Sequence, residues 1–442
     1  MTIPDMPSVS VIIPTFNRSA TVLNTLNALC EQSYPCQLTE VLVVADGCSD
    51  DTVESLQRYR APFALRTIDQ HNQGSAASRN RGAAAATGWL LIFLDDDAEP
   101  APSFIEAHVC AHRRQQAQAI IGPCISSFEG RGDFSRHVER AFWSDKFFTM
   151  RQPSHRFTYR DVVAGNFSLS AELFASLGGF DPAIPGRGAG YEFGARLIMS
   201  NARLSFAEDA IVHHREPETP DTGRSVRRAR DEARADVLLG AKHPALRPTL
   251  ALVHFEHRHT FIDRIVHGLA YRYVWLGDGL AALLRSMLTA LEGAKMRGLW
   301  RRVFMGLRRY WYLRGAADEL RSAKAVAAFL QGGSARKGQD GVEIDIDLSE
   351  GLEAAERELD EVRPSGAGLS YRGHLIGRIP SQAGAEPLRG AHLRPALAGD
   401  LAMSLLTALA LERACGRQIH LPSVFPGHVV ETPGVVDGSE SH

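Results

Sequence analysis

Three consecutive aspartates, Asp95 to Asp97, are the residues of this sequence best suited to chemistry. They follow a short apolar run, Leu90 to Leu94, which is typical of a buried strand. Carboxylates gathered at one point repel one another and are costly to desolvate unless a cation compensates them. Oxygen ligands favour Mg²⁺ or Mn²⁺, and Mg²⁺ is commonly held by one or two carboxylates together with substrate phosphates. The alternative, for the three aspartates alone, is a solvated acidic turn that caps the next helix.

Two more polar clusters follow apolar runs in the same way. Thr15 to Asn17 come after the run 9–13, and Asp46 and Gly47 come after the run 41–44. Strands that alternate with helices predict a mostly parallel sheet covered on both faces, with ligands at the carboxyl ends of its strands. We therefore expect the three polar clusters to meet at one edge of the sheet. The expected elements are strands at 9–13, 41–44, 63–68 and 90–94, and an alanine-rich helix at 76–86.

The second half of the chain has a different pattern. From about residue 225 to 329 strand signals vanish, while Arg, Ala and Leu recur at helical spacing. A glycine-rich polar stretch at 331–341 is typical of a linker. Beyond it, the sequence predicts a strand at 342–348, a charged helix at 350–362, a hairpin around Arg372 and Gly373, and one amphipathic helix at 397–413. We expect a domain at 8–224, a helical region at 225–330 and a small α/β domain at 342–425.

Composition narrows the class of protein. The net charge of −2 gives no reason to expect nucleic-acid binding. None of the six cysteines forms a C-x-x-C pair, so we expect reduced thiols and no zinc site. The N-terminus lacks the features of a signal peptide, and no stretch of 18 residues is free of charge, so we expect a cytoplasmic protein without a transmembrane helix. The basic, aromatic segment 295–314 suits either peripheral membrane contact or packing on the catalytic domain.

Six motifs that follow one another along the chain resemble those of family 2 glycosyltransferases with the GT-A fold. The resemblance covers about residues 8 to 215; each motif alone is weak, but six in order are highly specific. It implies an inverting, metal-dependent glycosyltransferase, with a mostly parallel sheet between helices, followed by the helical region and the small C-terminal α/β unit. The motifs are VIIPTFNR from Val11, VVADGCSDDT from Val43, SRNRG from Ser78, FLDDD from Phe93, GNFS from Gly165 and GGFD from Gly178.

The resemblance also implies roles for individual residues. Asp97 and Asp95 would bind Mn²⁺ or Mg²⁺, and Asp95 or Asp96 would contact the ribose. Asp46 is the candidate for contact with the base, although the family usually has a second aspartate where this chain has Ala45. The remaining nucleotide-sugar-binding candidates are Pro14, Thr15 and Asn17 for the nucleoside, and Arg79 and Asn80 for the ribose or diphosphate.

A histidine downstream can complete the metal or diphosphate shell in GT-A enzymes. His213 is the better match by spacing, and His214 is the alternative. Neutral imidazole suits Mn²⁺ better than Mg²⁺.

The general base is where this sequence departs from the family. The family usually reads Glu-Asp-x-Glu-Leu-Gly-x-Arg-Leu, whereas Ala189 and Gly190 stand at the first two positions here. Glu192 or Asp181 could replace the missing acid, or the domain could be catalytically impaired. Residues 190 and 192 point roughly 200° apart around a helix, so Glu192 is not a simple substitute.

Two functions therefore remain open. One is a hexosyltransferase that uses a nucleotide sugar, with UDP expected from the family. The alternative is an impaired, glycosyltransferase-like protein that binds nucleotide sugars. A glycan, a lipid and a peptide or natural product are all open as acceptors, and the C-terminal unit could serve a homo-oligomer or acceptor docking. A sugar-1-phosphate nucleotidyltransferase ranks last, because no glycine-rich basic loop follows the first strand.

Overall fold

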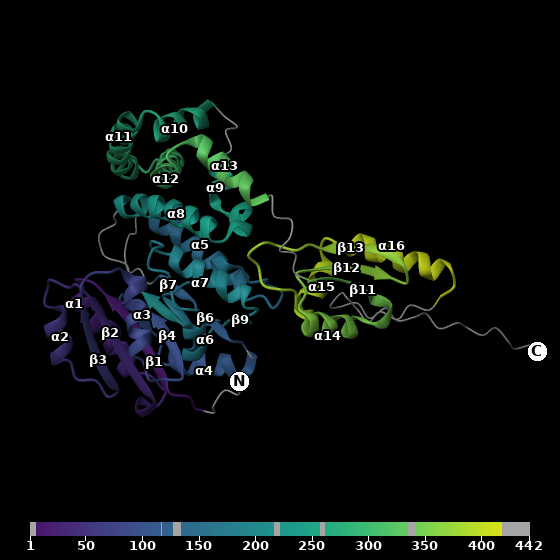
Figure 1. The fold of residues 1–442 in the computed structure, drawn as a ribbon, viewed down its shortest axis with the longest axis horizontal. Helices are drawn as coiled ribbons and strands as arrows, with labels where there is room; N and C mark the ends of the chain where they lie inside the picture. Colours follow the sequence, from purple (N-terminus) through teal and green to yellow (C-terminus); the bar gives the residue numbers. More distant parts are fainter. Residues whose placement is uncertain are drawn as a thin grey trace, which may run out of the picture. The chain divides into compact units, whose positions relative to one another are not determined.

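The computed structural model describes residues 6–115, 117–126, 134–215, 222–256, 261–334 and 342–417, which divide into two compact units (Figure 1). The first unit contains residues 1–339 and 383–386, and the second contains 340–382 and 387–442. The segment 383–386 belongs to the first unit because the Gly384 carbonyl accepts a hydrogen bond from the backbone N–H of Tyr159 at 2.9 Å. The three predicted domain borders stay predictions, and residues 418–425 lie outside the described residues.

A seven-stranded sheet forms the centre of the first unit, in the order β3-β2-β1-β4-β8-β6-β9. Strands β1 to β4 are parallel, and β8 runs antiparallel to both of its neighbours, β4 and β6. The carboxyl ends of β1, β2 and β4 therefore lie at one edge, as the sequence predicted. The strands are β1 (Val9–Thr15), β2 (Thr39–Asp46), β3 (Ala64–Gln70), β4 (Leu90–Leu94), β6 (Ala119–Ile121), β8 (Asn166–Ser170) and β9 (Leu204–Phe206).

Helices cover both faces of this sheet. Val11 and Ile13 of β1 face one layer of helices, whereas Ile12 faces the other. Because both faces are buried, the central strands read as continuous apolar runs rather than alternating ones. The fold class predicted from the sequence is confirmed. One layer contains α1 (Ser19–Cys30), α2 (Thr52–Arg58) and α4 (Phe104–Gln115), and the other contains α3 (Ser75–Ala85), α6 (Ala171–Ser176) and α7 (Gly188–Met199).

A second, three-stranded sheet lies beyond the end of β4, in the order β5-β10-β7. Strand β10 (Val212–His214) pairs antiparallel with β5 (Ala98–Pro100) and parallel with β7 (Cys124–Ser126). In this register His214 lies opposite Ala98, directly after the three aspartates. Helix α5 (Phe134–Met150) follows in the chain.

The predicted helical region consists of α8 to α13 (Figure 1). Helix α12 packs along α8 and also contacts α10 and α11. Helix α11 is long and apolar enough to cross a membrane by length and composition, which corrects the expectation that no such helix exists. The helices are α8 (Thr222–Lys242), α9 (Ala251–Glu256), α10 (Phe261–Tyr271), α11 (Val274–Gly293), α12 (Arg297–Leu320) and α13 (Ala323–Ser334).

The second unit is a three-stranded sheet with helices, as predicted. Its order is β11-β12-β13, and the hairpin turns at Arg372 and Gly373. The single helix predicted at 397–413 is wrong, because Gly399 takes non-helical backbone angles and two helices meet there at 81°. The elements are β11 (Glu343–Asp347), α14 (Leu352–Val362), β12 (Gly366–Tyr371), β13 (His374–Ile379), α15 (Leu393–Ala398) and α16 (Ala402–Ala414).

The contact between α8 and α12 depends on a glycine. A Cβ atom added to Gly315 would lie 2.1 Å from the carbonyl oxygen of Arg230, so Gly315→Ala must push the two helices apart. We expect it to lower the free energy of unfolding by roughly 1–3 kcal/mol. The matched control is Gly306→Ala on the same helix, where no heavy atom lies within 4 Å. It should stabilise by roughly 0.5–1 kcal/mol, because alanine favours helices.

Urea unfolding followed by tryptophan fluorescence measures both variants, since all the tryptophans lie in the first unit. Equal effects of the two substitutions would contradict the close contact.

Candidate active site

Asp96 is the most buried of the three aspartates after β4. One carboxylate oxygen accepts a hydrogen bond from Thr15 Oγ1 and the other from Arg18 Nη1, both at 2.8 Å. Its carbonyl accepts another from Thr25 Oγ1 at 2.8 Å. Burial raises the pKa of Asp96 to about 6 despite the charge of Arg18. Asp96 thus fastens the end of β4 to β1 and α1.

Asp95, Asp97 and His214 form the cluster best arranged to hold a metal ion. One potential ligand atom from each lies within 4.8 Å of the others. His214 Nε2 lies 2.9 Å from Asp97 Oδ1. Burial alone would raise the pKa of Asp97, but the hydrogen bond with His214 and the charge of Arg18 lower it. Two carboxylates and one imidazole are a donor set that fits Mn²⁺.

The structure favours His214 over His213 for this role. Successive side chains of a strand point to opposite faces, and in β10 it is His214 that reaches Asp97. The side chain of His213 is exposed. Spacing in the sequence alone did not reveal which of the two faces the aspartates.

Two arginines offset the negative charge of Asp95 to Asp97. Arg18 Nη1 bridges Asp96 and Asp97, at 2.8 and 3.0 Å. Arg79 Nη2 forms an ion pair with Asp95, while its Nε is buried without a hydrogen-bond partner. Arg79 was predicted to lie at the site, whereas Arg18 was missed. Its position directly after Asn17, beyond the carboxyl end of β1, was the available signal.

Other predicted nucleotide-binding residues hold loops together. Asn17 has a positive φ of 52°, and its Oδ1 accepts a hydrogen bond from the Ser49 N–H at 2.7 Å. It therefore ties the loop after β1 to the loop after β2. Pro14 is buried within β1.

Asp46 is buried at the end of β2, where its carboxylate holds the loop that leads into α3. Its oxygens accept hydrogen bonds from Gln70 Nε2 at 2.8 Å, the Gln73 N–H at 2.9 Å and the Gly74 N–H at 2.8 Å. Contact between this carboxylate and a nucleotide base stays a prediction.

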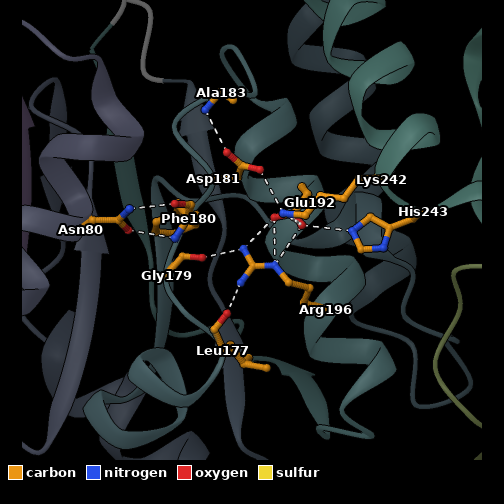
Figure 2. Close-up of polar contacts among 10 residues, drawn as sticks. All are labelled: Asn80, Leu177, Gly179, Phe180, Asp181, Ala183, Glu192, Arg196, Lys242 and His243. Carbon is orange, nitrogen blue, oxygen red and sulfur yellow. Dashed lines mark hydrogen bonds and ion pairs between the residues drawn. The ribbon is translucent and has the colours of Figure 1, made fainter.

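Asn80 clamps the backbone of Phe180 (Figure 2). Its Nδ2 donates to the Phe180 carbonyl at 2.7 Å, and its Oδ1 accepts from the Phe180 N–H at 2.8 Å. The two hydrogen bonds tie α3 to the loop that carries Asp181. Contact between Asn80 and a ribose or diphosphate stays a prediction.

Glu192, a candidate base, lies at the centre of a buried ionic cluster (Figure 2). Its carboxylate is 2.6 Å from Arg196 Nη2, 2.7 Å from Lys242 Nζ and 3.0 Å from His243 Nε2. Burial would raise the pKa of Glu192, but hydrogen bonds from His243, Arg196 and Lys242 lower it to about 2. A carboxylate held ionised by three partners is poorly suited to accept a proton. Glu192 instead joins α7 to the end of α8.

Asp181, the other candidate, lies beside this cluster in Figure 2. Its Oδ2 is 3.0 Å from Lys242 Nζ, and its Oδ1 accepts a hydrogen bond from the Ala183 N–H at 2.9 Å. Burial opposes ionisation, but the hydrogen bond from Lys242 lowers the pKa of Asp181. Unlike Glu192, Asp181 is partly exposed.

Ala189 and Gly190, which stand where the family usually has an acid, are surrounded by closely packed residues. Ala189 and Gly190 are buried at the start of α7. A Cβ atom at Gly190 would lie 3.1 Å from the Val162 carbonyl oxygen, and one at Gly188 would lie 2.3 Å from Ala235 Cβ on α8. Helix α8 therefore packs directly on the start of α7, so the loss of the acid accompanies a close contact there.

Comparison with known proteins decides the family of the sheet domain. Residues 10–178, which run from the second residue of β1 past β8 and include the three aspartates, match the sequence model of glycosyl transferase family 2. This stretch is a family 2 glycosyltransferase domain. The chain thus carries the catalytic domain type that its motifs predicted.

Two curated relatives are similar over nearly half of the chain. Glycosyltransferase AglE of Haloferax volcanii is 27% identical over 212 residues, which are 47% of this chain and 67% of AglE. Validoxylamine A glucosyltransferase of Streptomyces hygroscopicus subsp. jinggangensis is 28% identical over 235 residues, which are 46% of this chain and 54% of that enzyme. The chain thus spans only about half to two thirds of the length of these relatives.

Among solved structures, the mannosyltransferase PcManGT of Pyrobaculum calidifontis, in complex with GDP-Man and Mn²⁺, is similar with a TM-score of 0.43 and 19% identity. The match covers 75% of this chain and 86% of that one.

The cluster around Glu192 predicts a structural role that can be separated from a catalytic one. Glu192→Gln leaves the buried cations without their anion, and breaking a buried ion pair costs about 3–5 kcal/mol. We expect a loss of this size in the free energy of unfolding, measured in urea. The matched control is Glu208→Gln, whose ion pair with Arg151 is exposed, so its effect should be below about 1 kcal/mol.

The pH dependence follows from the lowered pKa of Glu192. Its stabilising contribution is complete above its ordinary pKa of 4.5 and is lost as the pH falls toward about 2. The difference between Glu192→Gln and the unsubstituted protein should narrow across that window. If Glu192→Gln leaves stability unchanged while abolishing sugar transfer, Glu192 is the base and the structural role is wrong.

Proposed function

We propose that this chain transfers a hexose from a nucleoside-diphosphate sugar to an acceptor, with inversion at the anomeric carbon. The observation that carries the proposal is the convergence of Asp95, Asp97 and His214 at the carboxyl edge of the sheet of a family 2 domain. Ligands bind at this edge in open α/β sheets. UDP is the proposed nucleotide, by its frequency in the family.

Asp95, Asp97 and His214 would hold Mn²⁺ or Mg²⁺ between them. Such an ion neutralises negative charge that develops on a diphosphate leaving group. The surrounding residues prepare the site for it: Thr15 and Arg18 fix Asp96, so that Asp95 and Asp97 on either side are held in place.

Arg18 and Arg79 would bind the phosphate groups of the donor. In this structure Arg18 and Arg79 form ion pairs with the aspartates. A bound metal ion would neutralise the carboxylates in their place. Their guanidinium groups are then available to donate hydrogen bonds to phosphate oxygens, which arginine binds in a forked geometry. The buried and unpartnered Nε of Arg79 adds a donor that a ligand can satisfy.

Activation of the acceptor is assigned to Asp181. Glu192 is fully enclosed by cations, and Ala189 and Gly190 carry no acid. Asp181 is partly exposed, and its ion pair with Lys242 must open for the carboxylate to accept a proton.

The packing at Ala189 and Gly190 favours a second candidate function. A domain that keeps its metal ligands and has closed the place of the base could bind a nucleotide sugar without transferring it. The two functions share donor binding and differ in turnover alone.

The test separates donor binding from transfer. We expect UDP-sugars with Mn²⁺ to raise the melting temperature, because a ligand that binds only the folded state stabilises it by about 2.7 kcal/mol at a hundred times its Kd. Asp97→Asn should abolish this shift, since it removes a charge from the ligand set. The matched control Asp209→Asn, at an exposed aspartate outside the site, should keep it.

A panel of UDP-, GDP- and dTDP-sugars identifies the donor, and release of the nucleoside diphosphate measures turnover. A metal-dependent shift with turnover supports the transferase. A shift without turnover on any acceptor supports the binding protein. If Asp97→Asn binds every donor as tightly as the unsubstituted protein, the metal site is assigned to the wrong residues.

A further inference from the structure

Helices α10 and α11 carry the largest exposed apolar side chains of the first unit. Phe261 is 76% exposed, Trp275 is 75% exposed and Leu283 is 69% exposed. Ile262, Leu276 and Leu280 on the same two helices are also exposed. Only 22% of the apolar window of α11 is buried. Large apolar side chains exposed together on two helices that contact each other indicate an interaction site rather than ordinary solvent exposure.

The exposed charge on these helices is mainly basic. Between residues 261 and 300 the only acidic side chains are Asp263, which is buried, Glu292, which is half-buried, and Asp278, whose side chain is 42% exposed. Asp263 pairs with Arg309, Asp278 accepts a hydrogen bond from Tyr310, and Glu292 accepts one from the Phe134 N–H. The basic side chains of the same segment are all exposed: Arg264, Arg272, Arg285, Lys295 and Arg297.

The exposed charge of this surface differs in sign from the net charge of the whole chain. The whole chain has a net charge of −2, yet this surface presents cations beside apolar side chains. Arg264 is exposed on α10 together with Phe261 and Ile265, and the exposed Arg272 follows directly after this helix. Aromatic residues are typical of membrane interfaces, and Tyr273 and Trp275 flank the start of α11.

We propose that the exposed faces of α10 and α11 bind the surface of an anionic lipid bilayer, with the apolar side chains in the headgroup region and the arginines on lipid phosphates. Amphipathic helices with this composition lie in the plane of the interface. Helix α11 lies flat in this arrangement and does not span the bilayer, because Gly277, Ala281 and Leu288 pack against the rest of the helical region.

The surface differs from the segment 295–314 that the sequence singled out. In α12 the apolar residues Trp300, Leu307 and Tyr310 are buried in the core of the helical region. Much of the apolar face of that segment is therefore occupied by packing. Met296 and Leu299 remain exposed, but less so than Phe261, Trp275 and Leu283 on the two preceding helices.

Trp275 makes the inference directly measurable. It is the only exposed tryptophan of the five in the chain, and all five lie among the described residues. Vesicles of phosphatidylcholine with phosphatidylglycerol should shift its emission to the blue, and spin-labelled lipids should quench it. Trp275→Phe should lose both signals while keeping cosedimentation with the vesicles.

Two double variants test the surface by vesicle cosedimentation. Each basic residue near an anionic membrane strengthens binding by about fivefold, so Arg264→Glu with Arg272→Glu should weaken it by at least about twentyfold. Trp275→Ser with Leu283→Ser should abolish it. The matched controls are Arg60→Glu and Leu375→Ser, at an exposed arginine and an exposed leucine elsewhere in the chain. Both should bind as the unsubstituted protein does.

Three results would overturn the proposal. The first is equal binding to phosphatidylcholine alone, which removes the charge argument. The second is unchanged binding by both double variants. The third is an absence of binding together with self-association that Trp275→Ser and Leu283→Ser break, which identifies a second copy of the chain as the occupant. Circular dichroism and thermal unfolding verify that each variant is folded, and donor binding measured in parallel shows whether the proposed function stands separately.

Discussion

The rest of the first unit is organised around the compensation of three negative charges at the end of β4. Asp95 to Asp97 leave a strand that is buried on both faces, so positive charge must reach them from elsewhere. It comes from two separate elements, Arg18 at the start of α1 and Arg79 on α3, and His214 on β10 adds an imidazole 2.9 Å from Asp97. Each partner is supplied by a different part of the fold, and their convergence fixes β1, α3 and the small second sheet relative to β4.

The same arrangement explains why the cluster suits a metal ion and a diphosphate. Arginine side chains are long and can exchange a carboxylate for a phosphate oxygen, whereas the carboxylates are held by the strand that carries them. Asp96 differs from Asp95 and Asp97, because Thr15 and Arg18 both donate hydrogen bonds to it and it is almost fully buried. The three aspartates therefore divide into Asp96, which joins β4 to β1 and α1, and Asp95 and Asp97, which form a cluster with His214.

Much of this was predictable from the sequence. The strands β1, β2 and β4 are continuous apolar runs, which the sequence shows directly, and parallel pairing then brings their polar ends together. Side-chain partners were less predictable, because they depend on backbone angles and on distant residues. Asn17 reaches Ser49 only because its φ is positive, and Glu192 meets Lys242 and His243 from fifty residues further along the chain.

The choice between His213 and His214 was likewise not predictable from the sequence. A shift of one residue in a strand turns every side chain to the opposite face, so the register of β10 against β5 had to be known. Nothing in the local sequence specifies that register.

The region of the missing base gives the site its distinctive character. Asn80 holds Phe180, Lys242 holds Asp181, and Glu192 holds Lys242 and His243, so a chain of polar contacts runs from α3 through the loop before α7 to the end of α8 (Figure 2). Glycines at 188 and 190 allow α8 and the Val162 carbonyl to approach the start of α7 closely. An acid restored at position 190 would have to displace that packing. Ala189 and Gly190 of α7 therefore carry no acid and lie within this packing, whereas Asp181, on the loop before α7, is partly exposed.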